Sequence, residues 1–554
     1  MNTYKLSAYI LIIIISFGCE QKQYQNTVVS GHPEATKIGI QVLEDGGNAI
    51  DASIAVQLAL SVCLPSAGNI GGGGFMVFRE SNGKVSTLDF REKAPKKSTK
   101  KMYLDYQGNI IDSLSTHGGL SVGVPGTIDG IFEAHRKFGS IKIENLFQYA
   151  IDLAMNGFTI TKIQAENFNY FQKDFKKFNP TNNYLQNRFW KEGDTLKQYD
   201  LANTLSIIRD LGRDGFYKGT IANSIVATIK DNGIISLEDL EDYKSIWREP
   251  ILLNFKNYTL ISMPPPSSGG IAISQLLMML SNFQTDSLQH NSAQYIHMLS
   301  EIEKIVYADR SKHLGDNDFY KVPVDNLLDT NYIKNRCLNI NLNKATPSDS
   351  IYAGNFSVNE SEETTHFSIV DKDGNSVSVT TTLNSSYGSK VFVNNRGFLL
   401  NNEMDDFSSK PGSPNIYGLL GSEANSIEPE KRMLSSMTPT IIEKEGELFM
   451  VLGTPGGSTI ITSVFQTILN AILFNMDIQN AVDMPRFHHQ WKPEKIYVEE
   501  TLNSDTLIQE LNNLGHVVQT RSPIGHVNAI MYNNGKISFG ADHRGDNHGE
   551  ISNK

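Results

Sequence analysis

The stretch Glu363-Thr364-Thr365-His366-Phe367-Ser368 opens a predicted β-hairpin. Strand patterns cover residues 366–370 and 376–382, and Asp373-Gly374 between them is a typical turn pair. Two threonines at a strand start mean little alone, because threonine favours strands. They gain meaning if the chain is cut before Thr364. A threonine hydroxyl is a weak nucleophile, but at a chain N-terminus its own α-amine, with an unperturbed pKa of about 7.7–8.0, can act as the base.

A second segment supplies the groups that such a nucleophile needs to stabilise an oxyanion. Gly453-Thr454-Pro455-Gly456-Gly457-Ser458 links an apolar strand pattern at 448–452 to a helical pattern at 458–474. Consecutive glycines let the backbone approach a ligand closely, and N–H groups at a helix start lack intrahelical partners. The alternatives are a plain strand-to-helix turn or a phosphate cradle. The P-loop ending Gly-Lys-Ser/Thr is absent from this segment, which argues against nucleotide binding.

A third set of polar residues suits the zwitterionic end of an amino acid. Arg91 follows a predicted strand, and a guanidinium binds a carboxylate bidentately. The pair Ser435-Ser436 could donate two hydroxyls to the same carboxylate. The run Asn402-Glu403-Met404-Asp405-Asp406 supplies anions for an ammonium group. Taken one at a time, however, such residues are usually solvated surface groups.

Around these segments the chain combines helical patterns with hairpins whose turns carry a glycine. Helical patterns cover residues 33–44 and 49–63. The further hairpin strands cover residues 75–79, 85–90, 440–443 and 448–452. The middle of the chain, residues 132–360, is predicted to be mostly helical. Hairpins in two distant regions, with helices between and after them, favour stacked sheets covered by helices.

The composition is that of a large acidic protein. The 554 residues include 49 basic and 60 acidic ones, which gives a net charge of -11. This charge repels a phosphate backbone and argues against nucleic acid as a partner. Besides Cys19, the chain holds only Cys63 and Cys337. Two cysteines so far apart in sequence predict neither a disulfide framework nor a metal site.

The N-terminus predicts export. Lys5 precedes an apolar run at 10–15, which is too short to span a bilayer and is typical of a signal peptide. Ser16-Phe17-Gly18-Cys19 then resembles a bacterial lipoprotein cleavage site with Cys19 as the lipidated first residue, although Phe17 departs from the commonest form. The alternative is an ordinary export signal in which Cys19 is incidental. Either way we expect a periplasmic or membrane-anchored protein of the bacterial cell envelope.

A series of motifs, taken in order, resembles the γ-glutamyltransferases (γ-glutamyl transpeptidases), a family of N-terminal-nucleophile hydrolases. The motifs are Leu88-Asp89-Phe90-Arg91-Glu92, Gly123-Val124-Pro125-Gly126-Thr127, Met263-Pro264-Pro265-Pro266-Ser267-Ser268-Gly269-Gly270, Tyr307-Ala308-Asp309-Arg310-Ser311, Thr364-Thr365-His366, Leu434-Ser435-Ser436-Met437 and Pro455-Gly456-Gly457-Ser458. The resemblance covers nearly the whole chain from about Val28. It implies an α+β fold, the αββα sandwich of N-terminal-nucleophile hydrolases, in which two mainly antiparallel sheets stack between helical layers.

The resemblance also implies a precursor that cuts itself. Thr364 would attack the carbonyl of Glu363 to give an ester that water hydrolyses, and Thr365 matches a residue important for this step. The chain would then comprise a signal peptide (1–18), a large subunit (19–363) and an associated small subunit (364–554). Neither a cofactor nor a metal is implied.

The same resemblance implies roles around the nucleophile. Thr364 would cleave the γ-glutamyl amide of glutathione or related compounds through a γ-glutamyl ester, which water or an acceptor amino acid or peptide resolves. By motif match, Gly456 and Gly457 donate to the oxyanion, Thr382 orients the nucleophile, Arg91, Ser435 and Ser436 bind the α-carboxylate, and Asn384, Glu403 and Asp406 bind the α-amine. Residues 411–418 resemble a lid loop with Tyr417 at its key contact.

Other functions stay open at this point. A cephalosporin or glutaryl acylase on the same scaffold would share Thr364 but need not keep the zwitterion contacts. An uncleaved, non-catalytic lipoprotein would be expected to lose Thr364 or the glycine pair, and neither is lost. A zinc hydrolase is suggested by His488-His489, His526, His543 and His548. Adjacent histidines on a strand point apart and no His-Glu-x-x-His pattern occurs, which favours packing or surface roles.

Overall fold

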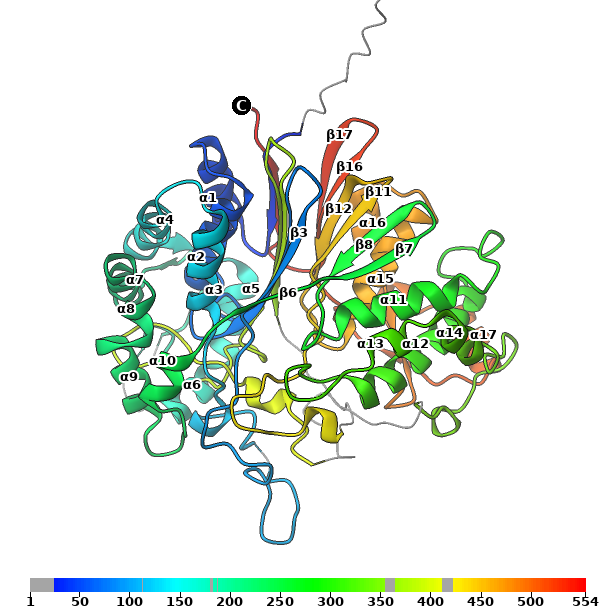
Figure 1. Cartoon of the computed structure of the whole chain (residues 1–554), viewed down its shortest axis with the longest axis horizontal. Helices are drawn as coiled ribbons and strands as arrows, with labels where there is room; N and C mark the ends of the chain where they lie inside the picture. The colour runs from blue at the N-terminus through cyan, green and yellow to red at the C-terminus, as the bar shows by residue number, and fades with distance from the viewer. Residues whose placement is uncertain (1–23, 112, 180–182, 187, 354–363, 411–421) are drawn as a thin grey trace, which may run out of the picture.

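The computed structural model describes residues 24–111, 113–179, 183–186, 188–353, 364–410 and 422–554. The described elements form four layers, in the order helices, sheet, sheet, helices (Figure 1). This arrangement confirms the predicted αββα sandwich. The predictions for Cys19, for Glu363 and for the lid at 411–418 with Tyr417 fall outside the described residues.

Two antiparallel sheets form the centre of the molecule. In spatial order, the first sheet contains β18 (His548–Ile551), β1 (Thr27–Ser30), β9 (Thr365–Val370), β10 (Ser376–Thr382), β2 (Gly73–Arg79), β3 (Val85–Asp89) and β6 (Ile246–Arg248). The second contains β17 (Lys536–Ala541), β16 (Asn528–Asn533), β12 (Glu447–Gly453), β11 (Thr440–Lys444), β8 (Tyr258–Ser262) and β7 (Ile251–Phe255). Both sheets therefore mix strands from the two sides of Thr364.

Helices cover the outer face of each sheet (Figure 1). On the side of the first sheet lie α1 (Pro33–Glu44), α2 (Ala49–Cys63), α3 (Thr127–Phe138), α4 (Ile143–Asn156), α5 (Lys162–Tyr170), α6 (Gln172–Phe178), α7 (Tyr199–Leu211), α8 (Arg213–Tyr217), α9 (Gly219–Ile229) and α10 (Leu237–Asp242). On the side of the second lie α11 (Gly269–Leu280), α12 (Ala293–His313), α13 (Val324–Leu327), α14 (Thr330–Cys337), α15 (Thr459–Ile472), α16 (Ile478–Asp483) and α17 (Asp505–Asn513).

Short elements complete the described chain. Two small sheets pair β4 (Phe158–Thr159) with β5 (Thr195–Leu196), and β13 (Phe487–His488) with β14 (Ile496–Val498) and β15 (Val518–Thr520). The 3₁₀ turns are η1 (Gly119–Ser121), η2 (Ser348–Ser350), η3 (Glu403–Asp406), η4 (Glu423–Asn425) and η5 (Glu500–Leu502). Of these elements, η3 matters most for the site, because it carries predicted ligand-binding carboxylates.

The first two helices form where the sequence predicts them, because their ends carry strong local signals. Pro33 occupies the first turn of α1, where a missing N–H costs nothing. Asn48 and Asp51 form a reciprocal capping box at the start of α2. Every residue of α2 is buried, as its apolar residues on most faces predict. This helix therefore belongs to the core, where it packs against α1, α4 and strands β9 and β10.

The alternating pattern of β9 and β10 is real, but its polar side does not face solvent. Phe367 and Ile369 of β9 pack into the core on the helical side. Ser368 faces the other sheet, and its hydroxyl donates to the carbonyl of Asn528 at 3.2 Å. In β10, the Ser378 hydroxyl donates to the carbonyl of Leu452 at 3.0 Å. Hydrogen bonds between the sheets thus satisfy these buried polar groups.

The prediction of a mostly helical middle, residues 132–360, was incomplete. This part of the chain also supplies β6, at an edge of the first sheet, and β7 and β8, at an edge of the second. The β7–β8 hairpin turns at Lys256-Asn257, and Lys256 adopts a φ of 55° without being glycine. The turn therefore lacks the glycine signal on which the other hairpin predictions depended.

Strand ends from both sheets meet at one edge of the sandwich. In the first sheet, β9 and β2 begin where β10 and β3 end. In the second, β11 and β16 begin where β8 and β12 end. The two edges touch at Gly453, because a side-chain carbon there would lie 2.5 Å from Cε1 of His366. Only glycine permits this approach, which brings the start of β9 close to the end of β12.

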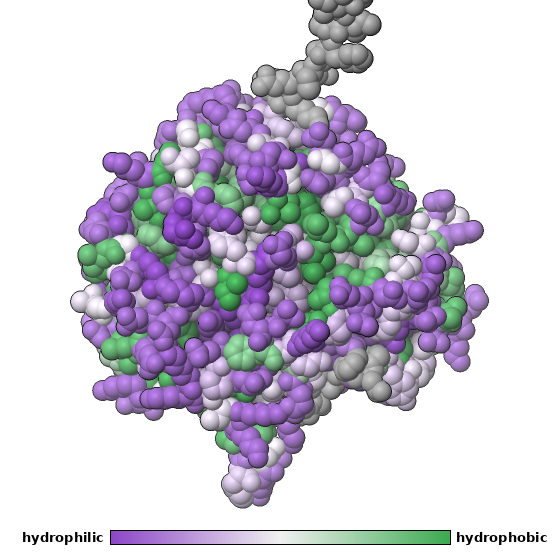
Figure 2. All heavy atoms as spheres, in the orientation of Figure 1, coloured by the Kyte–Doolittle hydropathy of each residue, from purple (hydrophilic) through white to green (hydrophobic). Residues whose placement is uncertain are grey.

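The surface is mainly polar. On the face shown in Figure 2, hydrophobic residues gather near the middle, over the region where β7 and β8 lie in Figure 1. Leu252 on β7 is 56% exposed. Among the helices that the structure describes, none combines the length and the apolar character needed to cross a membrane.

Candidate active site

Thr364 lies directly before β9 and between two cavities. The residue is 8% exposed, and it lines both a small polar cavity of about 10 Å³ and a larger one of about 470 Å³. The small cavity is also lined by Arg91, Thr382, Asn384, Glu403, Asp406, Ser435 and Ser436. The larger one is lined by, among others, Thr365, Gly456, His526 and Asn547. A nucleophile placed here can attack a group held in the small cavity, while the larger cavity has room for the rest of a ligand or for water.

Arg91 is the centre of a buried charge cluster at the wall of the small cavity. Its guanidinium lies 2.5 Å from the carboxylate of Glu403 and 3.5 Å from that of Glu92, and it also pairs with Asp406. Backbone carbonyls of Met433 and Leu434 accept hydrogen bonds from the same group at 3.3 and 3.2 Å. Three carboxyl groups thus surround one fixed cation, and all four side chains are at least 96% buried.

This excess of carboxyl groups shifts their protonation. Burial raises the pKa of Asp406 and of Glu92 well above the usual carboxyl range, and neighbouring carboxylates add to the rise while Arg91 opposes it. Burial likewise raises the pKa of Glu403. The cluster therefore favours an additional positive charge, either protons or the ammonium group of a ligand.

The remaining polar residues of the small cavity come from the end of β10 and from two loops. Asn384 follows β10 with a φ of 74°; its N–H donates to the Thr382 hydroxyl at 2.7 Å and its side-chain amide to the Asn402 carbonyl at 3.0 Å. Ser435 and Ser436 precede β11 and are each 3% exposed. The structure thus gathers around Thr364 the residues predicted to bind a zwitterion, although they are far apart in the sequence.

The glycine turn links β12 to α15, as predicted. Gly456 and Gly457 have φ values of 132° and 57°, a region that side chains disfavour. A side-chain carbon at Gly456 would lie only 2.6 Å from the Thr459 hydroxyl oxygen. This hydroxyl donates to the Gly456 carbonyl at 2.7 Å. The turn follows the strand end that touches His366, so its N–H groups belong to the same edge as Thr364. It has the backbone freedom that an oxyanion hole requires.

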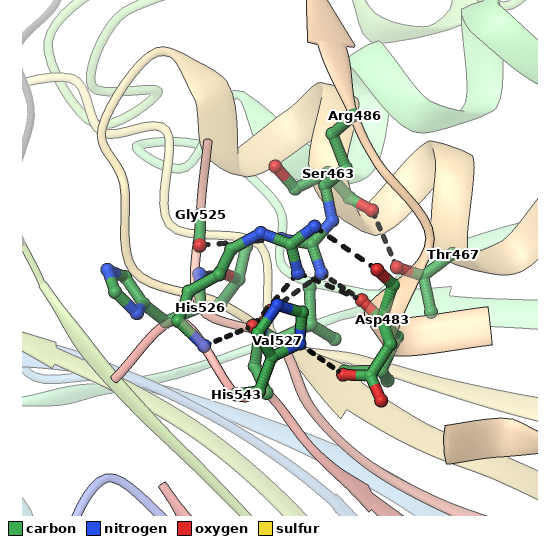
Figure 3. Close-up of polar contacts among 12 residues, drawn as sticks. Ser463, Thr467, Asp483, Arg486, Gly525, His526, Val527 and His543 are labelled. Carbon is green, nitrogen blue, oxygen red and sulfur yellow. Dashed lines mark hydrogen bonds and ion pairs between the residues drawn. The ribbon is translucent and has the colours of Figure 1, made fainter. Parts of the chain in front are cut away.

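A buried arginine supports the segment that packs against this turn (Figure 3). Arg486 donates to the carbonyls of Ile524 and Gly525 at 2.7 and 3.4 Å and pairs with Asp542 at 2.6 Å. The N–H of His526, the next residue, donates to the Thr454 hydroxyl at 2.7 Å, while its ring points away from this cluster. No local pattern predicts this support, because its members come from distant segments.

The histidines considered for a zinc hydrolase are placed differently from one another. Burial lowers the pKa of His488 to about 3, and its ring bonds with Thr462 and Gln490. Among the described residues, two groups could hold a metal ion, His297-Glu301-His516 and Asp483-Asp542-His543, and of the suggested histidines only His543 belongs to either. In each group a protein cation already pairs with a carboxylate, Lys304 with Glu301 and Arg486 with Asp542.

Comparisons with known proteins agree with this geometry. Residues 35–552 match the family model described as gamma-glutamyltranspeptidase. The chain is 44% identical over 530 residues to the glutathione hydrolase proenzyme of Escherichia coli (strain K12), covering 93% of this chain and 91% of that protein. A crystal structure of Helicobacter pylori gamma-glutamyltranspeptidase matches at 44% identity with a TM-score of 0.57, covering 59% of this chain and 94% of that one.

A cephalosporin acylase from Bacillus halodurans matches with a TM-score of 0.82, covering 100% of this chain and 98% of that one at 23% identity, which shows a shared fold alone. The four-layer sandwich makes the protein an N-terminal-nucleophile hydrolase in fold. Within that class, the chain belongs to the γ-glutamyltranspeptidase family.

The charge cluster predicts how stability depends on pH. Because burial raises the pKa of Glu92, the folded chain keeps a proton that the unfolded chain releases above about pH 4.3. Unfolding then releases a proton, so this group lowers stability as pH rises towards its folded pKa. Glu92→Gln removes that contribution, and its melting temperature relative to wild type should rise as the pH increases above about 4.3.

Thermal melting at several pH values measures this difference. The exposed Glu192 provides a control, since Glu192→Gln should show the same pH dependence as the wild type. A gap between Glu92→Gln and wild type that stays constant across the pH range would contradict the buried, proton-holding role of Glu92.

Proposed function

We propose that this protein is an autoprocessing γ-glutamyltransferase that cleaves the γ-glutamyl amide of glutathione and related compounds, with Thr364 as its nucleophile. The observation that carries the proposal is the position of Thr364 on a buried cavity in which one guanidinium faces several carboxyl groups. Membership of the γ-glutamyltranspeptidase family supports it.

The first reaction is the cut before Thr364. The Thr364 hydroxyl attacks the carbonyl carbon of Glu363, and the peptide nitrogen leaves as the α-amine of Thr364. The resulting ester between Glu363 and the Thr364 oxygen is hydrolysed by water, which restores the hydroxyl and leaves a carboxylate on Glu363. Thr365, the next residue in the sequence, is 3% exposed and is assigned a role in this step by its motif match. The products are a large subunit, 19–363, and a small subunit, 364–554.

The second reaction uses the amine that the first one frees. The α-amine of Thr364 takes the hydroxyl proton while the oxygen attacks the γ-amide carbon of the donor, and Thr382 orients the nucleophile. N–H groups of Gly456 and Gly457 bind the oxyanion, a contribution of about 10²–10³ in rate for each donor. The proton passes to the departing amine, which leaves a γ-glutamyl ester. Water or the amine of an amino acid or peptide then resolves this ester.

Charge balance explains the choice of a γ-glutamyl group. Its α-carboxylate binds Arg91, Ser435 and Ser436, and its ammonium binds near Asn384, Glu403 and Asp406. A zwitterion therefore enters the buried cavity without adding net charge. A glutaryl group lacks the ammonium and would add a negative charge beside raised-pKa carboxyls, which favours γ-glutamyl donors over an acylase function.

Self-cleavage is the first test. Purified protein should give two bands on a denaturing gel, and N-terminal sequencing of the smaller band should read Thr-Thr-His-Phe. Thr364→Ala should remain one chain and lose at least about 10³-fold in γ-glutamyl turnover, because both reactions need the same hydroxyl. A single uncleaved chain in active protein, or full turnover by Thr364→Ala, would contradict the proposed mechanism.

Donor recognition is the second test. Arg91→Ala should raise KM for γ-glutamyl donors about 10–100-fold, as expected for losing a charge-assisted bidentate contact. Self-cleavage should continue, which serves as the control for folding. Unchanged KM together with a gain of activity on glutaryl compounds would instead favour an acylase.

We also propose that the protein is exported and anchored through Cys19. The proposal rests on the apolar run at 10–15 and on the Gly18-Cys19 pair. A lipid on this cysteine would anchor the mature chain without spanning the bilayer. Wild-type protein expressed in bacteria should partition into the detergent phase and Cys19→Ser into the aqueous phase. Equal partitioning of the two would leave an ordinary export signal as the explanation.

A further inference from the structure

Helix α12 carries two side chains that reach different parts of the site. The Tyr307 hydroxyl donates to the carbonyl of Ser458. Arg310 donates from Nε to the Ser268 hydroxyl at 2.9 Å and from Nη2 to the Ser436 hydroxyl at 3.3 Å. The two residues are three positions apart and so share one side of the helix. They belong to the motif 307–311, to which the proposed mechanism gives no role.

Tyr307 acts on the residue that ends the glycine turn. Ser458 directly follows Gly457 and precedes α15. Its carbonyl accepts from Tyr307, and its hydroxyl donates to the side chain of Gln490 at 2.7 Å. Glycines have no side chains through which they can be held, so the direction of the turn's N–H groups depends on how Ser458 is fixed.

Arg310 acts on the serine pair. It bonds Ser436 directly, and it reaches Ser435 through Ser268, whose hydroxyl and N–H both donate to the Ser435 carbonyl at 2.8 and 2.7 Å. Burial lowers the pKa of Arg310 to about 9, so its guanidinium stays charged at neutral pH. A planar guanidinium can serve both hydroxyls at once, which a lysine ammonium in one position does less well.

Asp309, which lies between Tyr307 and Arg310 in the sequence of α12, fixes the orientation of this helix. Its carboxylate accepts from Arg336 and from the Tyr332 hydroxyl, each at 2.8 Å, and from Gln275 at 3.3 Å. Partners on α11 and α14 thus prevent α12 from turning about its axis. The positions of Tyr307 and Arg310 are therefore set independently of the site itself.

We propose that Tyr307 and Arg310 are positioning residues with separate effects. Tyr307 aligns the glycine turn and so controls the rate of acyl transfer, whereas Arg310 aligns Ser435 and Ser436 and so controls affinity for the donor carboxylate. This inference rests on the proposed function. It means that a helix of the large subunit positions two parts of the small subunit's site after the cut.

The test for Tyr307 uses a matched tyrosine on the same helix. Tyr307→Phe should lower kcat about 10–100-fold and slow self-cleavage, with KM changed less than about twofold, because oxyanion contacts form chiefly in the transition state. Tyr295 is 2% exposed, and its hydroxyl has no hydrogen-bond partner among the described residues. Tyr295→Phe should therefore keep wild-type kcat and KM.

The test for Arg310 looks for the opposite pattern. Arg310→Lys should raise KM for γ-glutamyl donors about 10-fold and change kcat less than about threefold. Ser268→Ala, which removes the link to Ser435 without altering a buried charge, should shift KM in the same direction. Arg136→Lys is the control, since Arg136 lies on α3 and pairs with Glu133. With a donor whose α-carboxylate is converted to an amide, Arg310→Lys and wild type should react alike.

The outcomes separate this inference from the proposed function. A wild-type chain that neither cuts itself nor turns over γ-glutamyl donors would overturn the proposed function. In an active wild type, the same kcat and KM pattern in Tyr307→Phe and Arg310→Lys would overturn the division of roles. An equal loss in Tyr295→Phe would show that α12 supports only the fold. Melting temperatures of all variants reveal any that fail to fold.

Discussion

The contact between His366 and Gly453 is the constraint on which the site depends. The imidazole occupies the space that a side chain at Gly453 would need, and it bonds with the hydroxyls of Thr380 and Ser368 at 2.9 and 3.0 Å. Burial lowers the pKa of His366 to about 3, so the ring is neutral and adds no charge between the sheets. Because Thr364 lies two residues before this ring and the glycine turn begins directly after Gly453, one contact sets the distance between nucleophile and turn. The histidine of the Thr364-Thr365-His366 motif is thus a spacer between sheets.

A second constraint is electrostatic. Three carboxyl groups surround the guanidinium of Arg91, and two of them, Glu403 and Asp406, line the small cavity together with it. A ligand that breaks these ion pairs must offer charges of its own to the same groups. Leaving a buried charge unpaired costs on the order of several kcal/mol. A zwitterion meets this condition for both signs of charge. A simple anion pairs only with the guanidinium, and a simple cation pairs only with the carboxylates. The larger cavity on the other side of Thr364 imposes no such charge requirement on the rest of the ligand.

Local signals predicted the fold better than they predicted the support of the site. The helical patterns at 33–44 and 49–63 and the glycine turns predicted correct elements, because each signal acts within a few residues. The β7–β8 hairpin was missed because Lys256 adopts a left-handed conformation without glycine. Motif resemblance named the residues that line the small cavity, and the structure brings them together. The roles of Arg486 and of Tyr307 were not predictable, because they depend on side-chain contacts between segments far apart in the chain.

The distribution of strands explains how the cut can change the chemistry without changing the fold. In the first sheet β9 lies between β1 and β10, so strands from either side of Thr364 are hydrogen-bonded neighbours. In the second sheet β8 pairs with β11 across the same division. Separating the two subunits would therefore break both sheets at once. The site is assembled before cleavage, and α12 already fixes its two sides from the large-subunit part of the chain. What the cut adds is a free amine at Thr364, so one set of residues can serve both self-cleavage and turnover.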